Sequence, residues 1–151
     1  SGGEMKNPTY LDVAHHSAPG HRESILVTYD PTQITFKKII QFYLDHIDPT
    51  DGGGQFHDRG ESYAPAIFYA NDEEKGVAED CIKEADESKV YDKPIAVAIL
   101  PRKEFYKAED YHQDYASKNP DHYASYRRGS GREDYVNNVC QIRETKIPWR
   151  E

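Results

Sequence analysis

Cysteine is scarce in this chain, and long apolar runs are missing. Its 151 residues include two cysteines, Cys81 and Cys140, too few for a disulfide framework and compatible with a reducing compartment such as the cytoplasm. No run of about eighteen apolar residues occurs, so no membrane span is predicted. An excess of 27 Asp and Glu over 19 Lys and Arg argues against nucleic-acid binding. A soluble domain remains, whose chemistry would depend on a thiol acting as a reagent.

Apolar patterning predicts alternating strands and helices. Strands are expected at residues 24–29, 63–70 and 94–100, and helices at residues 35–46, from Asn71 through Ala85, and at 109–117. Asn71 and Glu74 form a capping pair for the second helix. This alternation favours an α/β or α+β sandwich around a mixed sheet. Residues 1–126 are predicted to form the domain, and residues 127–151 an extended tail that packs on it.

Three separated segments carry an unusual set of polar and aromatic side chains. They are Asn7-Pro8-Thr9-Tyr10 leading to Gly20-His21-Arg22-Glu23, then His57-Asp58-Arg59-Gly60-Glu61-Ser62-Tyr63, then residues 108–120 with the sequence AEDYHQDYASKNP. In order and spacing they resemble the peptide methionine sulfoxide reductases of the A type, which reduce the S-epimer of methionine sulfoxide. The resemblance implies that family's fold, a two-layer α/β (α+β) sandwich with a ferredoxin-like core, a mixed sheet and flanking helices.

Sulfoxide reduction needs a soft nucleophile that attacks sulfur and an acid that protonates the departing oxygen. The resemblance assigns the acid to Glu23 and neighbouring hydroxyl donors to Tyr10 and Tyr63. The other residues that it places at the substrate pocket are Asp58, His112, Tyr115 and Tyr123.

Ordinary structural roles compete with these assignments when each residue is taken alone. Glu23 precedes an apolar stretch, where a glutamate is usually a solvated edge residue. Tyr63 and Tyr123 could be half-buried tyrosines with satisfied hydroxyls, and His112 a surface histidine. The three segments together favour the pocket. The histidines match no standard metal-ligand spacing, so no metal is expected.

The nucleophile is the conspicuous absence. The family carries its catalytic cysteine in a Gly-Cys-Phe-Trp-Gly turn near the N-terminus, and this sequence has no such turn. We expect that cysteine upstream of Ser1 or on another chain. Cys81 lies on a predicted apolar stripe and is expected to be inert. Cys140 is either a displaced resolving cysteine or a free tail thiol, with a substitute nucleophile as a further alternative.

The resemblance therefore implies reduction of methionine-(S)-sulfoxide, free or in peptides and proteins. The implied reductant is an external thiol, thioredoxin or dithiothreitol, with no metal or organic cofactor. The alternative is a non-catalytic module that binds methionine sulfoxide and lacks the nucleophile.

Overall fold

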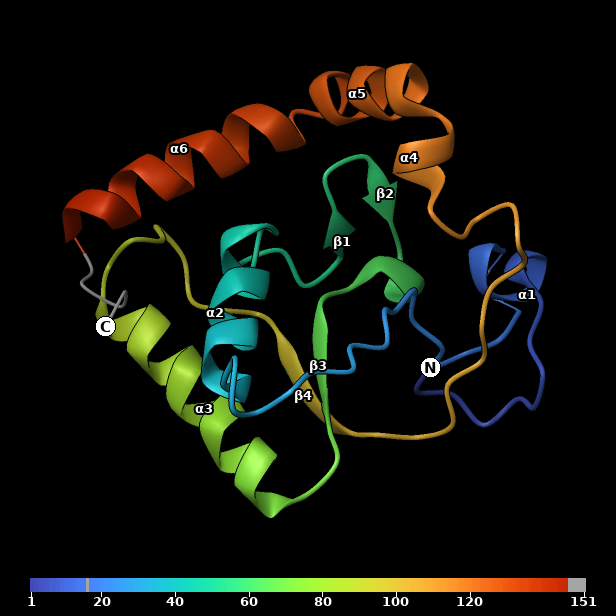
Figure 1. Ribbon diagram of the computed structural model, residues 1–151, viewed down its shortest axis with the longest axis horizontal. Coiled ribbons are helices and arrows are strands. Elements are labelled where there is room, and N and C mark those ends of the chain that lie inside the picture. The colour runs from blue at the N-terminus through green and yellow to red at the C-terminus, as the bar shows by residue number, and fades with distance from the viewer. Residues whose placement is uncertain (16, 147–151) are drawn as a thin grey trace.

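The computed structural model describes residues 1–15 and 17–146, and the side chains of residues 140 and 143–146 lie outside that description (Figure 1). Its helices are α1 (Tyr10–Ala14), α2 (Phe36–Asp45), α3 (Asp72–Glu87), α4 (Tyr115–Lys118), α5 (Pro120–Gly129) and α6 (Arg132–Lys146), with a 3₁₀ turn η1 (Glu61–Tyr63). Its strands are β1 (Gly54–Gln55), β2 (Asp58–Arg59), β3 (Ala66–Tyr69) and β4 (Ala98–Pro101). None of the helices in this part of the chain is long and apolar enough to cross a membrane.

The predicted α+β class is confirmed, but the strands form two separate pairs. β3 and β4 run parallel, with Ile67 opposite Ile99, and β1 and β2 form a short antiparallel ribbon. The parallel pair lies beside α2 and α3, while the ribbon lies beneath α5 (Figure 1). The parallel and antiparallel pairing that was expected within one mixed sheet is thus divided between two separate strand pairs.

The two central helices begin where their capping residues predict. The Thr35 hydroxyl accepts from the Lys38 backbone N–H at 3.2 Å, and the Asn71 side chain accepts from the Glu74 N–H at 2.9 Å. The Glu74 carboxylate accepts in turn from the Ala70 N–H at 2.6 Å, one residue before the N-cap. These bonds satisfy N–H groups that a helix start leaves without partners.

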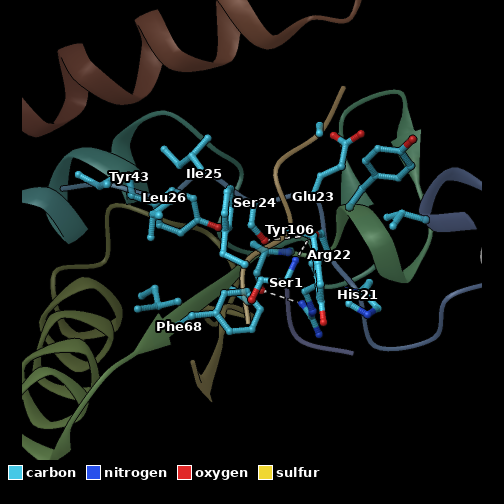
Figure 2. A pocket seen from close by; sticks show the side chains of 18 of the residues that line it. Ser1, His21, Arg22, Glu23, Ser24, Ile25, Leu26, Tyr43, Phe68 and Tyr106 are labelled. Carbon is cyan, nitrogen blue, oxygen red and sulfur yellow. Dashed lines mark hydrogen bonds between the residues drawn. The ribbon is translucent and has the colours of Figure 1, made fainter. Parts of the chain in front are cut away.

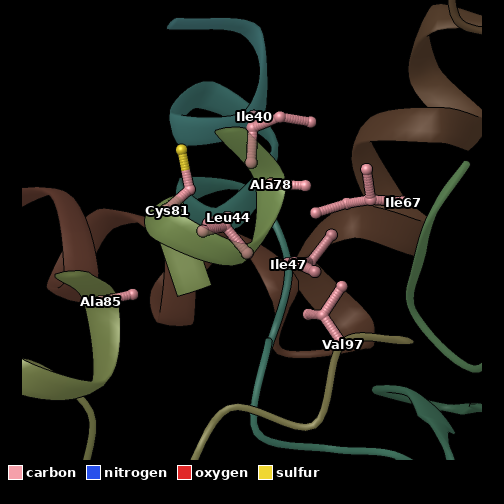
Figure 3. Close-up of a cluster of buried hydrophobic side chains, with 8 residues drawn as sticks. All are labelled: Ile40, Leu44, Ile47, Ile67, Ala78, Cys81, Ala85 and Val97. Carbon is pink, nitrogen blue, oxygen red and sulfur yellow. The ribbon is translucent and has the colours of Figure 1, made fainter. Parts of the chain in front are cut away.

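The core lies where α2 and α3 pack on the β3–β4 pair (Figure 3). Leu44 of α2 and Cys81 of α3 are completely buried, and Ile67 of β3 and Val97 close the cluster beside the strands. Burial of such side chains away from water is the dominant favourable contribution to folding. This core holds the scaffold on which the N-terminal segment and the loops are arranged.

The predicted strand at residues 24–29 is wrong for the part of the chain that the structure describes. The segment belongs to neither strand pair, and Ile25, Leu26 and Val27 are 85%, 56% and 46% exposed. The alternation of apolar residues is typical of a strand, but a strand also needs a partner for its backbone groups. The segment therefore makes no ladder of backbone hydrogen bonds with a strand of the described chain.

The predicted extended tail is also wrong, because residues 132–146 form helix α6. Val136 and Val139 are 5% and 6% exposed, and their spacing of three places both on the helix face that packs toward α2. Gly131, with φ at 79°, separates α6 from α5. Residues 147–151 lie outside the described residues, and the division of the chain at residue 126 stays a prediction.

The helix expected at residues 109–117 is shorter than predicted. Asp114 has φ at 55°, a left-handed conformation that a continuous helix excludes, so α4 starts only at Tyr115. Asn119-Pro120 separates α4 from α5, and Pro120 takes the first position of α5, where its missing N–H costs nothing.

Leu44→Ala tests the placement of the core. Because Leu44 is fully buried, we expect the free energy of unfolding to fall by roughly 2–5 kcal/mol. The matched control is Leu11→Ala on α1, where the leucine is 60% exposed and a change within about 0.5 kcal/mol is expected. Urea denaturation followed by circular dichroism measures both. Equal losses for the two variants would contradict this core.

Candidate active site

A cavity of about 1020 Å³ opens between the N-terminal segment, α2, η1 and the chain after β4. Figure 2 shows the 22–26 segment crossing this cavity, with Glu23 and Ile25 projecting on the same side. Five of the predicted site residues line it together, namely Tyr10, Glu23, Asp58, Tyr63 and His112. The lining also includes an apolar part formed by residues such as Ile39, Ile40 and Phe68. The cavity therefore joins a polar, aromatic end to an apolar wall.

Glu23 is positioned by backbone bonds on both sides of it. Its N–H donates to the Ser62 carbonyl at 2.8 Å, and the Arg22 N–H donates to the Ser1 carbonyl at 2.8 Å. The Arg22 guanidinium donates to the carbonyls of Ala64 and Pro65 at 2.8 and 3.1 Å. Glu23 is thus tied to η1, the turn that carries Tyr63.

His21 anchors the same segment from beneath. Its side chain is 2% exposed, and its Nε2 lies 2.9 Å from the Met5 carbonyl oxygen. Gly3 passes so close that a Cβ there would lie 2.2 Å from the His21 ring. The glycine and the histidine therefore fix how the N-terminal segment enters the cavity wall.

The rings of Tyr10 and His112 lie in contact although the two residues are far apart in the sequence. The Tyr10 N–H, at the start of α1, donates to the Glu109 carboxylate at 3.2 Å, which joins α1 to the loop that carries His112. The two rings are 4.4 Å apart between centroids. The Nε2 atom of His112 is buried, and among the described residues it has no hydrogen-bond partner. It is a polar group in the cavity wall with bonding capacity unused by the protein.

The electrostatics of the cavity raise the pKa of Glu23. Its side chain is open to water within the cavity, yet the surrounding walls exclude enough bulk solvent that desolvation raises the pKa of its carboxyl group. The negative charge of Asp58 raises this pKa further, and His112 acts in the opposite direction. Glu23 therefore keeps its proton to higher pH than an ordinary glutamate, as a general acid requires.

Tyr63 remains a neutral hydroxyl donor for a related reason. Partial burial raises the pKa of Tyr63, and the charges of Glu23, Tyr10 and Asp58 add to this effect. A phenol with a raised pKa holds its proton throughout the neutral range. Tyr63 can thus donate a hydrogen bond to an oxygen atom beside Glu23.

Tyr126 was not predicted as a site residue, although the structure brings it to the site. Its hydroxyl donates to the Oδ2 atom of Asp58. Partial burial, followed by this bond and the charge of Asp58, raises the pKa of Tyr126 to about 12. Tyr126 follows Tyr123 by one helical turn on α5, and this i, i+3 spacing was the only signal in the sequence.

Tyr115 and Tyr123 are placed differently from the prediction. Neither belongs to the described residues that line the cavity. The Tyr115 hydroxyl lies 3.0 Å from Nδ1 of His122, and the Tyr123 side chain is 40% exposed. The structure does not bring these two rings to the cavity, and their contact with substrate stays a prediction.

The thiols differ in how far the structure describes them. Cys81 lies in the core on α3, where burial raises its pKa to about 11. The predicted burial of Cys81 is confirmed, and because a thiol that stays protonated at neutral pH is a poor nucleophile, its inertness stays the expectation. The Cys140 side chain, predicted as a resolving cysteine, lies outside the described residues. Within the described part of the chain, no cluster of three His, Cys, Asp or Glu residues is arranged to hold a metal ion.

Glu23→Gln tests the environment of the carboxyl group through stability. A raised pKa means that the ionised form is disfavoured in the folded protein, so folding stability declines as pH rises from the ordinary value of 4.5 through the raised value. We therefore expect Glu23→Gln to raise the melting temperature more at neutral pH than at about pH 4. The exposed Glu61→Gln is the matched control and should show no such gain at neutral pH. A Glu23→Gln effect that is independent of pH would contradict the assignment.

Comparisons with known proteins show what the chain is similar to. A family model described as peptide methionine sulfoxide reductase matches residues 1–144. The chain is 48% identical over 136 residues to the peptide methionine sulfoxide reductase MsrA of Bacillus licheniformis, covering 90% of this chain and 75% of the relative. It is 47% identical over 136 residues to MsrA 2 of Staphylococcus aureus strain MW2, covering 90% and 76%.

Two solved structures are similar as well. Methionine sulfoxide reductase A of Corynebacterium diphtheriae aligns with a TM-score of 0.64 and 32% identity, over 80% of this chain and 61% of that chain. Reduced Mxr1 from Saccharomyces cerevisiae aligns with a TM-score of 0.58 and 33% identity, over 62% and 50%. The chain thus spans about three quarters of the length of its curated relatives and half to three fifths of the solved structures. It belongs to the peptide methionine sulfoxide reductase family.

Proposed function

We propose that the protein reduces methionine-(S)-sulfoxide to methionine, either free or in peptides and proteins, with thiols as the source of electrons. Membership of the family supports the reaction class. The observation that carries the proposal is the carboxyl group of Glu23, whose pKa is raised in a cavity that it shares with the phenols Tyr10 and Tyr63. This arrangement suits the transfer of a proton to the oxygen of a sulfoxide.

Glu23 is the general acid of the proposed reaction. The sulfoxide oxygen accepts hydrogen bonds from Tyr10 and Tyr63 while Glu23 donates its proton to that oxygen. A thiolate attacks the sulfur atom, the sulfur–oxygen bond breaks, and the oxygen passes to the attacking sulfur. Methionine leaves, and the thiol becomes a sulfenic acid. A second thiol condenses with the sulfenic acid to give a disulfide and water, so two thiols supply the two electrons.

The attacking thiolate is a group other than Cys81, because that thiol is buried and stays protonated. Cys140 or an external thiol serves as the second thiol in the proposal. The disulfide is then reduced by a thioredoxin-like protein, or by dithiothreitol in the test tube. The chemistry calls for no metal or organic cofactor, and we assign it to the cytoplasm, where such reductants keep thiols reduced.

A reduction assay tests the acid assignment. The intact protein is incubated with dithiothreitol and a peptide carrying both epimers of methionine sulfoxide, and the products are separated by chromatography. We expect the S-epimer alone to be consumed, and Glu23→Gln to slow its reduction by roughly 10²- to 10⁴-fold, the usual worth of general acid catalysis. Glu61→Gln should react at the parent rate. Full activity of Glu23→Gln would refute the assignment.

Two further arms of the assay separate the thiols and the alternative function. Cys81→Ala should retain the activity per folded molecule, whereas Cys140→Ser should slow regeneration only if Cys140 is the resolving thiol. Substrate binding is followed separately by NMR shifts of the Tyr10 and Tyr63 rings. Stereospecific binding of the sulfoxide peptide without turnover would select the non-catalytic binding module.

A further inference from the structure

The C-terminal helices reach the site through the loop that carries Asp58. Residues 48–59, called here the 48–59 loop, contain the β1–β2 ribbon and lie beneath α5 (Figure 1). Tyr126, near the end of α5, donates a hydrogen bond from its hydroxyl group to the Asp58 carboxylate. The two residues are 68 positions apart in the sequence, so this bond joins two distant parts of the chain at the edge of the cavity.

Helix α6 holds the same loop at two further points. The Arg132 guanidinium lies over the Phe56 ring at 4.7 Å from its centroid, within the range of a cation–π contact. The Tyr135 ring meets Phe56 edge-on at 5.6 Å, and its hydroxyl donates to Oδ1 of Asp48 at 3.3 Å. Three side chains of α5 and α6, namely Tyr126, Arg132 and Tyr135, thus make four contacts with one short loop.

The loop needs such support because its backbone is strained. Phe56 has φ at 54°, which is unfavourable for a bulky side chain. Gly54 has φ at 150°, and a Cβ there would lie 2.3 Å from the Asp58 carbonyl oxygen. A conformation of this kind persists only where the surroundings impose it. The contacts to Phe56 and Asp58 supply that restraint from outside the loop.

We infer that Tyr126 is a positioning residue that fixes the Asp58 carboxylate beside Glu23, an assignment that rests on the acid role proposed for Glu23. Asp58 affects the acid through its negative charge, so its distance from Glu23 matters. Without the Tyr126 hydroxyl, the Asp58 side chain is free to turn toward solvent. The C-terminal helices then help to set the surroundings of the Glu23 carboxyl group.

Several ionisable groups face Glu23 from the elements packed around it. They are Asp58 on β2, Tyr63 on η1, His112 in the loop before α4, Tyr126 on α5 and Tyr10 on α1, with Arg132 of α6 also lining the cavity. Desolvation and Asp58 raise the pKa of Glu23, whereas His112 lowers it. Removal of the Tyr126 hydroxyl leaves His112 in place and weakens the contribution of Asp58 alone.

Tyr126→Phe tests the inference without any substrate. The titration of the Glu23 side-chain carboxyl is followed by carbon-13 NMR, with the signal assigned by its loss in Glu23→Gln. We expect the titration midpoint of Glu23 to be lower in Tyr126→Phe than in the parent, and to shift in the same direction in Asp58→Asn. Tyr91→Phe is the matched control, because it loses a hydroxyl bond of 3.1 Å to the Leu44 carbonyl and neither residue lines the cavity. It should leave the midpoint unchanged.

The inference is overturned if Glu23 titrates in Tyr126→Phe as it does in the parent, while Asp58→Asn shifts the Glu23 midpoint. Asp58 would then keep its position without the Tyr126 hydroxyl group. A measurement on the unaltered protein covers the case in which a variant does not fold. Nuclear Overhauser contacts between the Tyr126 ring and the Asp58 β-protons are expected, and their absence overturns the inference too. In the reduction assay, the pH above which the rate of reduction falls should be lower in Tyr126→Phe than in the parent.

If the parent protein is inactive but the titrations are as expected, the result counts against the proposed function and not against the positioning of Asp58.

Discussion

The site depends on two carboxyl groups that lie close together in one cavity. Glu23 and Asp58 repel each other when both are ionised, and the walls of the cavity weaken the hydration that would otherwise relieve this repulsion. This repulsion raises the pKa of Glu23, while Asp58 accepts a hydrogen bond from Tyr126. In the proposed reaction Glu23 is the acid and Asp58 its neighbour, so that different surroundings would give the same chemical group two roles.

The remaining structure maintains this arrangement from both sides. The α2–α3 core supports β3, and η1 just before β3 binds the backbone of Glu23 through the Ser62 carbonyl. From the opposite side, α6 packs toward α2 through Val136 and Val139 and carries Arg132 to the 48–59 loop. The acid and its neighbour are thus held by separate elements, and their separation is set by tertiary packing rather than by local sequence.

The difference between features set by local sequence and features set by tertiary packing explains what the sequence could predict. The helices α2 and α3 follow from apolar spacing and capping residues, which are local signals. The segment 24–29 has the alternation of a strand, but pairing depends on a partner elsewhere, and the pattern cannot report one. Residues 132–146 looked extended because they have few apolar residues, although two valines at helical spacing were enough to dock α6.

The same distinction applies to the site. Tyr10, Glu23, Asp58, Tyr63 and His112 were predicted because motif residues keep their order and spacing, and all five line the cavity. Tyr123 was predicted in the same way, yet Tyr126 makes the contact with Asp58. Which of two tyrosines one turn apart reaches Asp58 depends on how α5 packs over the loop, which is a property of the assembled fold.

The use of phenols around Glu23 has a physical reason. A cationic donor in the same place would also bind the sulfoxide oxygen, but its field would lower the pKa of Glu23, as His112 does in part. A neutral hydroxyl donates a hydrogen bond without that field. Because burial and the nearby charges raise the pKa of Tyr63, it remains a donor over the whole range in which Glu23 can act as an acid. In the proposed reaction, neutral donors around Glu23 would therefore bind the sulfoxide oxygen without lowering the pKa of the carboxyl group that must protonate it.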